Sequence, residues 1–167
     1  ELIVKLTEEE KLIRAWLIYK ELIGKNGILK IVLKRALPII NNEIASLLNG
    51  LVDFEVALSI SDDSKVCIDL IRDGVTMSVG TAASGYEETM ASLALRSALA
   101  TVSSFAKPNL LVLDEIFGAT GSSHYDDIRE LLNRIMKNHD FIIDITHNEM
   151  IMDWHEQIIE VVKDNNI

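Results

Sequence analysis

Hydrophobic spacing changes near residue 50 and divides the chain into two regions. Before that point apolar residues recur three and four positions apart, which is the spacing of one helix face. Thr7, followed three residues later by Glu10, has the form of a capping box and predicts that a helix begins there. Gly24 predicts the end of this helix.

A second helix is expected over 28–48, bent or broken at Pro38 and closed by Gly50. The glycine and polar residues over 24–27 indicate a turn between the two helices. Residues 1–50 are therefore predicted to form a helical hairpin. Its apolar stripe is wide for so small a unit, so the hairpin is expected to need a partner surface.

From Asp53 onward apolar residues alternate with polar ones, which is typical of half-buried strands. Turn signals separate three such segments, and Asp73-Gly74 is a dipeptide common in hairpin turns. The pattern predicts an antiparallel β-meander. Its strands are expected over 54–60, 66–70 and 75–79, with the first turn at 62–64.

Beyond Gly85, helical and strand patterns alternate, which predicts a parallel sheet with flanking helices. Ala91, Ala94 and Ala98 share one side of the first helix and would let it lie close to a sheet. Residues 51–167 are therefore expected to form one α/β lobe. The helices are expected over 85–104, 124–138 and 149–154, and the strands over 110–113, 141–146 and 157–162.

Charge is distributed unevenly along this acidic chain, whose formal net charge is −10. That balance argues against a freely basic nucleic-acid binder. Residues 1–35 nevertheless carry eight Lys or Arg against five Asp or Glu, so this segment could face a polyanion. The alternative is that these basic residues lie on solvated helix faces.

Composition also bears on where the protein works. The 167 residues, 49% of them hydrophobic, are enough for one core without disulfides. The longest apolar run, 15–19, has five residues, and a membrane-spanning helix needs about 20. Cys67 is the single cysteine, which indicates a reducing compartment, the cytoplasm, and no secretory leader is recognised. Because the chain begins with Glu1, it is expected to be processed or cut from a longer protein.

Two acids follow the apolar strand over 110–113, which is expected to be buried. Asp114 and Glu115 would lie at the carboxyl edge of a parallel sheet, where ligands bind in open α/β folds. At that edge Asp114 can orient Mg²⁺ through water. Glu115 can polarise an attacking water as a general base.

A serine-glycine turn precedes the longest helix expected after residue 50. Ser84 and Gly85 lie where unpaired amides and the positive end of the helix dipole converge, which favours an anion. The alternative is an ordinary helix start, with Ser84 as the cap and Glu87 as the acid of a capping box. The residues alone leave both interpretations open.

His147 follows the strand expected over 141–146, about thirty residues after the two acids. An imidazole at this position can contact a phosphate or hold a water, although an isolated histidine is often only structural. The four histidines and Cys67 show no metal-ligand spacing, so no such metal site is expected.

In chain order, a serine-glycine turn into a helix, an apolar strand with Asp-Glu and a strand ending in His resemble the C-terminal half of an ABC-type, P-loop ATPase head. With the expected helical hairpin and β-meander, the chain is similar to the structural-maintenance-of-chromosomes (SMC) branch, and most to the double-strand-break repair ATPases of phage and bacterial recombination exonucleases. Tyr86 stands where the signature motif commonly has its second glycine. The matches are Ser84-Gly85-Tyr86-Glu87 to the signature motif, Asp114 to the Walker B acid, Glu115 to the catalytic glutamate and His147 to the switch histidine.

The resemblance implies an ATP hydrolase in which two heads sandwich two ATP molecules. Ser84 and the rest of the signature motif would act in trans, on the nucleotide held by the second copy. In the same head Asp114 would serve Mg²⁺ through water, Glu115 would activate water, and His147 would sense the γ-phosphate. Arg96, on the signature helix, would relay the bound state toward a coiled coil.

The resemblance also implies partners. They are an N-terminal head half carrying the Walker A loop, a second copy of the head, a repair nuclease subunit at the base of the coil, and double-stranded DNA. No membrane is implied, and the expected location is the cytoplasm, or the nucleoid if the protein is phage-encoded. Trp16 could form a docking face for the nuclease, and packing of Trp16 within the hairpin is the alternative.

Two departures from the family pattern matter. A phosphate-cradling loop is absent: the nearest stretch, 19–26, lacks both the first glycine and the final hydroxyl. The missing head half is therefore expected to supply it. In the segment 116–121, Gly121 stands where the D-loop of the family usually has an aspartate.

Three further possibilities remain open on the sequence. A transporter nucleotide-binding subunit would have the same motifs, but the helical hairpin argues against it. A dimerisation module without ATP turnover is kept open by Gly121. Asp144 interrupts an apolar strand and is expected to pair with a Lys or Arg or to lie at an edge.

Overall fold

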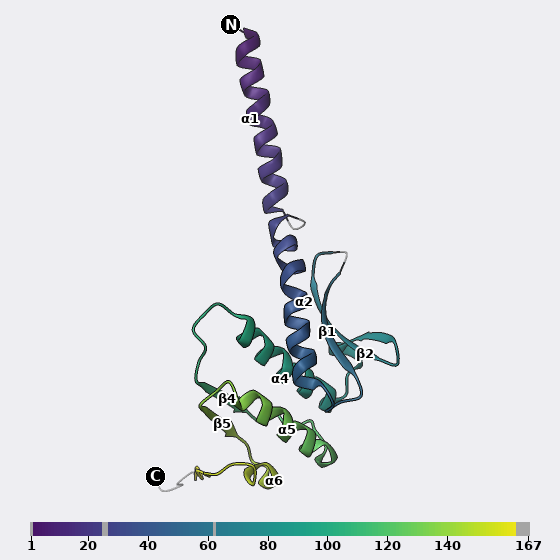
Figure 1. Cartoon of the computed structure of the whole chain (residues 1–167), viewed down its shortest axis with the longest axis vertical. Helices are drawn as coiled ribbons and strands as arrows, with labels where there is room; N and C mark the ends of the chain where they lie inside the picture. The colour runs from purple at the N-terminus through teal and green to yellow at the C-terminus, as the bar shows by residue number, and fades with distance from the viewer. Residues whose placement is uncertain (1, 25–26, 62, 163–167) are drawn as a thin grey trace, which may run out of the picture.

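A helical stalk stands on a small head that mixes helices with two sheets (Figure 1). The computed structural model describes residues 2–24, 27–61 and 63–162. The stalk consists of α1 (Leu2–Ile23) and α2 (Ile28–Leu48). The head contains β1 (Glu55–Ile60), β2 (Val66–Arg72), β3 (Val75–Ser78), α3 (Val79–Ala82), α4 (Gly85–Val102), β4 (Leu110–Asp114), a 3₁₀ turn η1 (Ser122–His124), α5 (Tyr125–Met136), β5 (Phe141–Ile145) and α6 (Glu149–Met152). This inventory confirms the predicted α/β class.

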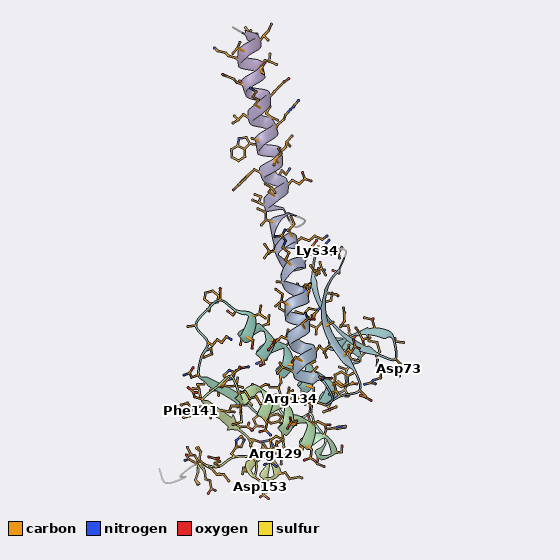
Figure 2. The ribbon with its side chains drawn as sticks, viewed as in Figure 1. Lys34, Asp73, Arg129, Arg134, Phe141 and Asp153 are labelled. Carbon is orange, nitrogen blue, oxygen red and sulfur yellow. The ribbon has the colours of Figure 1, made fainter. Side chains whose placement is uncertain are left out.

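Both predicted stalk helices form, but their arrangement differs from the expected hairpin. Figure 1 shows α1 running away from the head along the direction of α2, so the two helices lie nearly end to end. No residue of α1 is buried, and Figure 2 shows its side chains radiating freely. The expected packing of Trp16 within a hairpin is not seen among the described residues: Trp16 is 63% exposed, and its ring meets that of Tyr19 in the same helix, edge to face at 5.8 Å. Lys25 and Asn26 of the predicted turn lie outside the described residues.

Thr7 is not the first residue of α1, so the predicted start was wrong. Its Oγ1 donates to the carbonyl oxygen of Ile3 at 2.9 Å, one turn earlier in the same helix. The helix extends upstream because Leu2, Lys5 and Leu6 are good helix formers and no glycine or proline lies before Thr7. A capping box is only a local signal, and it yields when the helical pattern continues on both sides.

The second half of α2 anchors the stalk to the head. Pro38 lies inside α2 without ending it, and the helix closes as predicted before Gly50, whose φ is +70°. The Asn41 side chain holds β1 from this helix: Nδ2 donates to the Leu58 carbonyl at 3.0 Å, and Oδ1 accepts from the Leu58 amide at 2.8 Å. The buried residues of α2 are Leu37, Ile40, Ile44, Leu47 and Leu48.

The β-meander is confirmed. Strands β1, β2 and β3 pair antiparallel in sequence order, with Val56 opposite Leu70 and Leu70 opposite Met77. Asp73 and Gly74 both have positive φ, 50° and 76°, as a two-residue hairpin turn requires. Asp62 of the other predicted turn lies outside the described residues.

Strands β4 and β5 pair in parallel, as predicted, with Leu111 opposite Ile142. The expectation that β4 is buried was wrong for this chain. Its Leu110 and Val112 side chains are 45% and 52% exposed, because α4 and α5 contact the head side of the pair and nothing in the described chain covers the other side. Only Leu113 of β4 is fully buried.

The strand predicted over 157–162 does not form. These residues are irregular, and Ile159 and Val161 are 87% and 92% exposed. An apolar alternating segment becomes a strand only beside an edge that accepts its hydrogen bonds. In the described parts of the chain no strand lies next to it.

The core lies where α2, α4 and α5 meet the meander. Its most deeply buried side chains include Ile44, Leu70, Met90, Ile128 and Leu131. Within the ranges that the structure describes, no helix is both long and apolar enough to cross a bilayer.

Candidate functional site

A sharp bend at the end of β4 places two carboxylates at the carboxyl edge of the parallel pair. Glu115 has φ +51°, in the left-handed region that glycine favours, and its amide donates to the Ile145 carbonyl at 2.9 Å. Such a backbone conformation is costly for a residue with a side chain and is concentrated at functional sites. The bend is fixed by β5, so Asp114 and Glu115 leave the strand in defined directions.

His147 meets Glu115 at this edge. Its Nδ1 lies 2.9 Å from Oε1 and 2.8 Å from Oε2 of Glu115, although the residues are 32 positions apart. Both side chains are exposed, His147 by 79% and Glu115 by 51%. Among the described residues no hydrogen-bond partner contacts Nε2 of His147, so this nitrogen is free to meet a bound group.

The turn before α4 is a complete capping box. The Ser84 Oγ accepts from the Glu87 amide at 3.3 Å, and Glu87 Oε2 accepts from the Ser84 amide at 2.7 Å. The ordinary-cap interpretation is thus satisfied geometrically. Ser84 is exposed and its hydroxyl proton remains available, so the anion interpretation also stands. The buried Glu87 carboxylate is neutralised by an ion pair with Arg72 of β2.

Gly85 is required by close packing against the segment that follows Glu115. A Cβ on Gly85 would lie 2.3 Å from the Ala119 carbonyl oxygen, which no real side chain tolerates. Beside this contact the Thr120 hydroxyl donates to Thr89 Oγ1 at 3.3 Å, and Thr89 donates to the Gly85 carbonyl at 2.8 Å. The turn at 84–87 and the predicted D-loop segment, 116–121, are therefore packed on each other within one chain.

Tyr86 extends this packing to the start of α5. Its ring stacks on His124 with centroids 3.9 Å apart and an interplanar angle of 17°, and its hydroxyl donates to Asp127 Oδ2 at 2.9 Å. Burial raises the pKa of Tyr86 well above its ordinary value, and the hydrogen bond and negative charge of Asp127 raise it further. The phenol therefore stays protonated and remains a donor.

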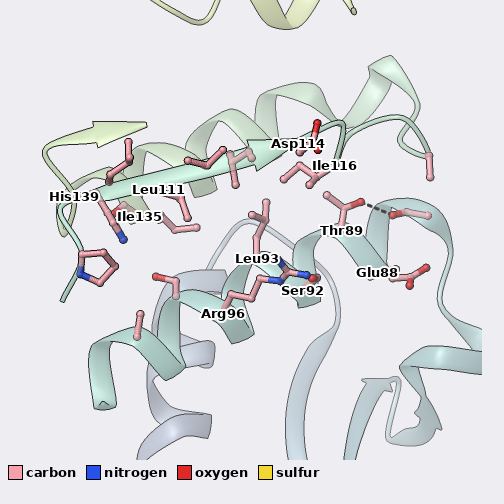
Figure 3. A pocket seen from close by; sticks show the side chains of 18 residues that line it. Glu88, Thr89, Ser92, Leu93, Arg96, Leu111, Asp114, Ile116, Ile135 and His139 are labelled. Carbon is pink, nitrogen blue, oxygen red and sulfur yellow. Dashed lines mark hydrogen bonds between the residues drawn. The ribbon is translucent and has the colours of Figure 1, made fainter. Parts of the chain in front are cut away.

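A groove between α4 and β4 is lined by residues of two predicted motifs, the Ser84-Gly85-Tyr86-Glu87 turn and the Asp114-Glu115 pair. Figure 3 shows Asp114 at the end of β4, on the opposite side of an open space from Glu88, Ser92 and Arg96 of α4. The groove encloses about 550 Å³, and Gly85 also lines it. Among the described residues, however, no hydrogen bond joins Ser84 to Glu115 or His147.

Asp144 pairs with a histidine instead of the expected Lys or Arg. Its side chain is fully buried, and Oδ2 lies 3.2 Å from Nε2 of His155, which follows α6. Burial raises the pKa of Asp144, and the hydrogen bond and charge of His155 offset this only in part. The pair ties the segment after α6 to the strand that leads to His147.

The sequence interpretation missed three positioning contacts. Tyr125 accepts from Asn148 Nδ2 at 2.6 Å and so fixes the residue after His147 to the first turn of α5. Asp127 holds Tyr86, and Arg72 holds Glu87. One signal of these contacts is visible in the sequence: the two acids Asp126 and Asp127 in the first turn of α5. Acids at such positions usually interact favourably with the helix dipole, so they did not point to a contact with Tyr86.

A resident metal site is not formed by side chains alone. No group of three or more His, Cys, Asp or Glu side chains with metal-site geometry occurs among residues 2–24, 27–61 and 63–162. Asp114 and Glu115 nevertheless offer exposed or half-exposed carboxylate oxygens, the ligands that Mg²⁺ takes when it also keeps waters and phosphates. These residues therefore suit a nucleotide-bound Mg²⁺.

No family model matches the chain. Among curated proteins it is 26% identical over 160 residues to an uncharacterized protein of Acanthamoeba polyphaga mimivirus. The match covers 87% of this chain but only 12% of that protein's length.

Several solved structures are similar to this one. An SMC ATPase studied for ATP-driven dimerization and DNA-stimulated activation superposes with a TM-score of 0.66 at 15% identity, covering 83% of this chain and 85% of that chain. The Pyrococcus furiosus Smc head with an extended coiled coil, bound to the C-terminal domain of ScpA, gives 0.59 at 18% identity, over 90% and 37%. The Pyrococcus yayanosii Smc head with a coiled coil and joint gives 0.60 at 18%, over 91% and 29%. The chain therefore has the fold of the C-terminal lobe of an SMC head.

Proposed function

We propose that this chain is the C-terminal half of an ATP-hydrolysing head that dimerises around ATP and drives a DNA-end-processing nuclease complex. The observation that carries the proposal is the contact between Glu115 and His147 at the carboxyl edge of β4 and β5. In folds with this parallel arrangement, that edge is where ligands bind. The SMC-head fold is consistent with it.

Each residue at this edge has a role that its geometry allows. Glu115 takes the proton of an attacking water at its carboxylate, while His147 orients that carboxylate through Nδ1 and keeps Nε2 for the γ-phosphate. Asp114 binds Mg²⁺ through water. Bound ATP and Mg²⁺ supply the transferable phosphoryl group and the positive charge that favours its release.

Ser84 and the first amides of α4 bind the γ-phosphate of the nucleotide held by the second copy. The helix N-terminus favours an anion, and the Ser84 hydroxyl can donate to it. No hydrogen bond joins Ser84 to Glu115 or His147 of its own described chain, which is consistent with an arrangement in which Ser84 serves one nucleotide and Glu115 with His147 the other. Dimerisation and hydrolysis are thereby coupled.

The N-terminal head half supplies the phosphate-binding loop and covers the exposed apolar face of β4 and β5. Leu110, Val112 and Ile143 of these strands are each about half exposed in the described chain. Exposed apolar surface of this kind is usually covered by a partner. The stalk continues into a coiled coil, its basic residues face DNA, and the exposed Trp16 contacts the nuclease near the coil base.

The proposal is tested on the complete head, assembled with the half that carries the phosphate-binding loop. Glu115→Gln is expected to lower the rate of ATP hydrolysis by about 10² or more, since it removes a general base, while stabilising the ATP-bound dimer. Glu156→Gln, an exposed acid outside the site, is the matched control. Unchanged turnover of Glu115→Gln would contradict its role as the base.

The trans role of Ser84 needs a separate measurement. Ser84→Arg is expected to abolish ATP-dependent dimerisation in analytical ultracentrifugation, because a larger cation fills the space of the partner's phosphate. Ser104→Arg, at an exposed position just beyond the far end of the same helix, is the control. A normal dimer of Ser84→Arg would leave Ser84 as a helix cap only.

The repair role is tested with the nuclease present. Cleavage of linear double-stranded DNA should require ATP and stop in Glu115→Gln. Two alternatives predict other results. A dimerisation module would form the ATP-bound dimer without hydrolysing ATP, which is consistent with Gly121 in the D-loop. A transporter subunit would show no response to DNA. The exposed stalk, which a transporter subunit does not need, favours the first proposal over the last.

A further inference from the structure

Tyr86 connects the turn that carries Ser84 to the start of α5. It follows Gly85 in the first turn of α4, and both its ring and its hydroxyl contact residues that lie near 124–127. The ring stacks on His124, and the hydroxyl donates to Asp127. Phe54 also packs against the ring, edge to face, with the centroids 6.3 Å apart. The side chain is therefore held by two neighbouring rings and by the hydrogen bond at its tip.

The same turn has little freedom of its own. Gly85 packs directly on the Ala119 backbone, and Thr89 and Thr120 join their hydroxyls next to it. Ser84, by contrast, is exposed, and its only described side-chain partner is the Glu87 amide. The direction of the Ser84 hydroxyl thus depends on how the turn is attached to segment 116–127.

The first turn of α5 also contacts the strand end that carries His147. Tyr125, two residues before Asp127, holds Asn148, which directly follows His147. The first turn of α5 therefore contacts the turn that carries Ser84 through Asp127 and the strand end that carries His147 through Tyr125.

We propose that Tyr86 is a positioning residue for ATP-dependent dimerisation, which clamps the Ser84 turn to the first turn of α5. This inference rests on the proposed function and adds to it a residue outside the reacting groups. The phenol replaces a glycine that the signature motif commonly has at this position, so it gives this chain an attachment that glycine cannot make. Its side chain takes no part in the reaction and acts through the placement of Ser84.

Two properties suit Tyr86 to this role. The hydrogen bond reaches from one helix start to another, which fixes both their spacing and their rotation. The acceptor is a carboxylate, and such charge-assisted hydrogen bonds are stronger than neutral ones. A substitution that removes the hydroxyl and keeps the ring should make the Ser84 turn more mobile, while the stacking on His124 is retained.

The test compares Tyr86→Phe with the parent in the complete head. Amide hydrogen exchange of Glu87 and Glu88, whose N–H groups bond back to Ser84, is expected to become about tenfold faster. ATP affinity of the monomeric head should stay unchanged, whereas the dissociation constant of the ATP-bound dimer should rise about tenfold. Tyr19→Phe, on the exposed stalk helix, should alter none of these.

A second variant separates the clamp from a general loss of stability. Asp127→Ala removes the acceptor and should reproduce the Tyr86→Phe effect, and the double variant should be no weaker than either single variant. Unchanged amide exchange in Tyr86→Phe, or additive effects in the double variant, would overturn the clamp. Faster exchange with an unchanged dimer constant would overturn its role in dimerisation. If the parent head forms no ATP-dependent dimer, the proposed function fails, and the exchange data still decide whether the clamp exists.

Discussion

Arg134, in the last turn of α5, closes the C-terminal end of α2 by donating from Nη1 to the Leu47 carbonyl oxygen at 2.9 Å. The same nitrogen donates to the Asn49 carbonyl at 2.8 Å, and Glu130 accepts from Nε one turn earlier at 3.2 Å. The last carbonyls of a helix have no partner within it and carry partial negative charge, so a guanidinium satisfies both needs. This contact joins the stalk to the head.

Removing the guanidinium should therefore weaken the junction of stalk and head. Arg134→Gln is expected to lower the free energy of unfolding by about 1–3 kcal/mol, because partly buried carbonyls lose a charged donor. Urea unfolding of the complete head measures this. Arg129→Gln makes the same change on the exposed side of α5 and should shift stability by less than about 0.5 kcal/mol. Equal effects of the two variants would contradict a specific role for Arg134.

Gly85 should resist even the smallest enlargement. Gly85→Ala would place its Cβ against the Ala119 carbonyl, and relief requires the backbone after Glu115 to move. The expected cost is about 1–3 kcal/mol in thermal or urea unfolding, with lower ATPase activity of the complete head.

Gly80→Ala is the control for this substitution. No atom lies within 4 Å of a Cβ built at Gly80, and its φ is not positive, so alanine there should be neutral or slightly stabilising. If Gly85→Ala were as stable and active as Gly80→Ala, the close packing of the turn on the D-loop segment would not hold.

Asp144 should make stability depend on pH. Its pKa in the folded protein lies above the ordinary value of about 3.9 in the unfolded chain, because burial disfavours the carboxylate. The folded state then binds more protons than the unfolded state between these two values, so this residue's contribution to stability falls as pH rises through them. Asp144→Asn removes that titration and keeps an oxygen for His155.

The stability advantage of Asp144→Asn over the parent should therefore be smallest near pH 4 and largest at pH 7. Thermal unfolding across that range measures it, with Asp153→Asn, the same substitution at an exposed position in the same region, as the comparison. A difference between Asp144→Asn and the parent that stays constant with pH would contradict the raised pKa.

Local patterns predicted most of the head. The alternating strands around Asp73-Gly74, the parallel pair, and the helix that begins at Gly85 all form where the sequence placed them. These elements are determined by periodicity and turn chemistry within a few residues. The sequence showed only that Glu115 and His147 each follow a strand. Their contact became visible when the two strands were found side by side in the fold.

The failures have a common physical cause. The side-by-side hairpin, the burial of β4 and the strand over 157–162 each depend on a surface that packs against the element. An apolar pattern shows that a residue favours burial, but it does not show which chain supplies the cover. Tyr86 with Asp127 was missed for a different reason, since side-chain hydrogen bonds between residues 41 positions apart leave no periodic trace.

The attachment of α2 also gives the stalk a mechanical property. Its 21 residues span about 31 Å at 1.5 Å per residue, while Asn41 and the Arg134 contact grip only the half next to the head. A rigid rod held at one end amplifies small rotations, and a tilt of about 10° at the base moves the far end of α2 by about 5 Å, half a helix diameter. A small rotation where α2 meets the head is thus amplified along the stalk, at the end that lies farthest from the head.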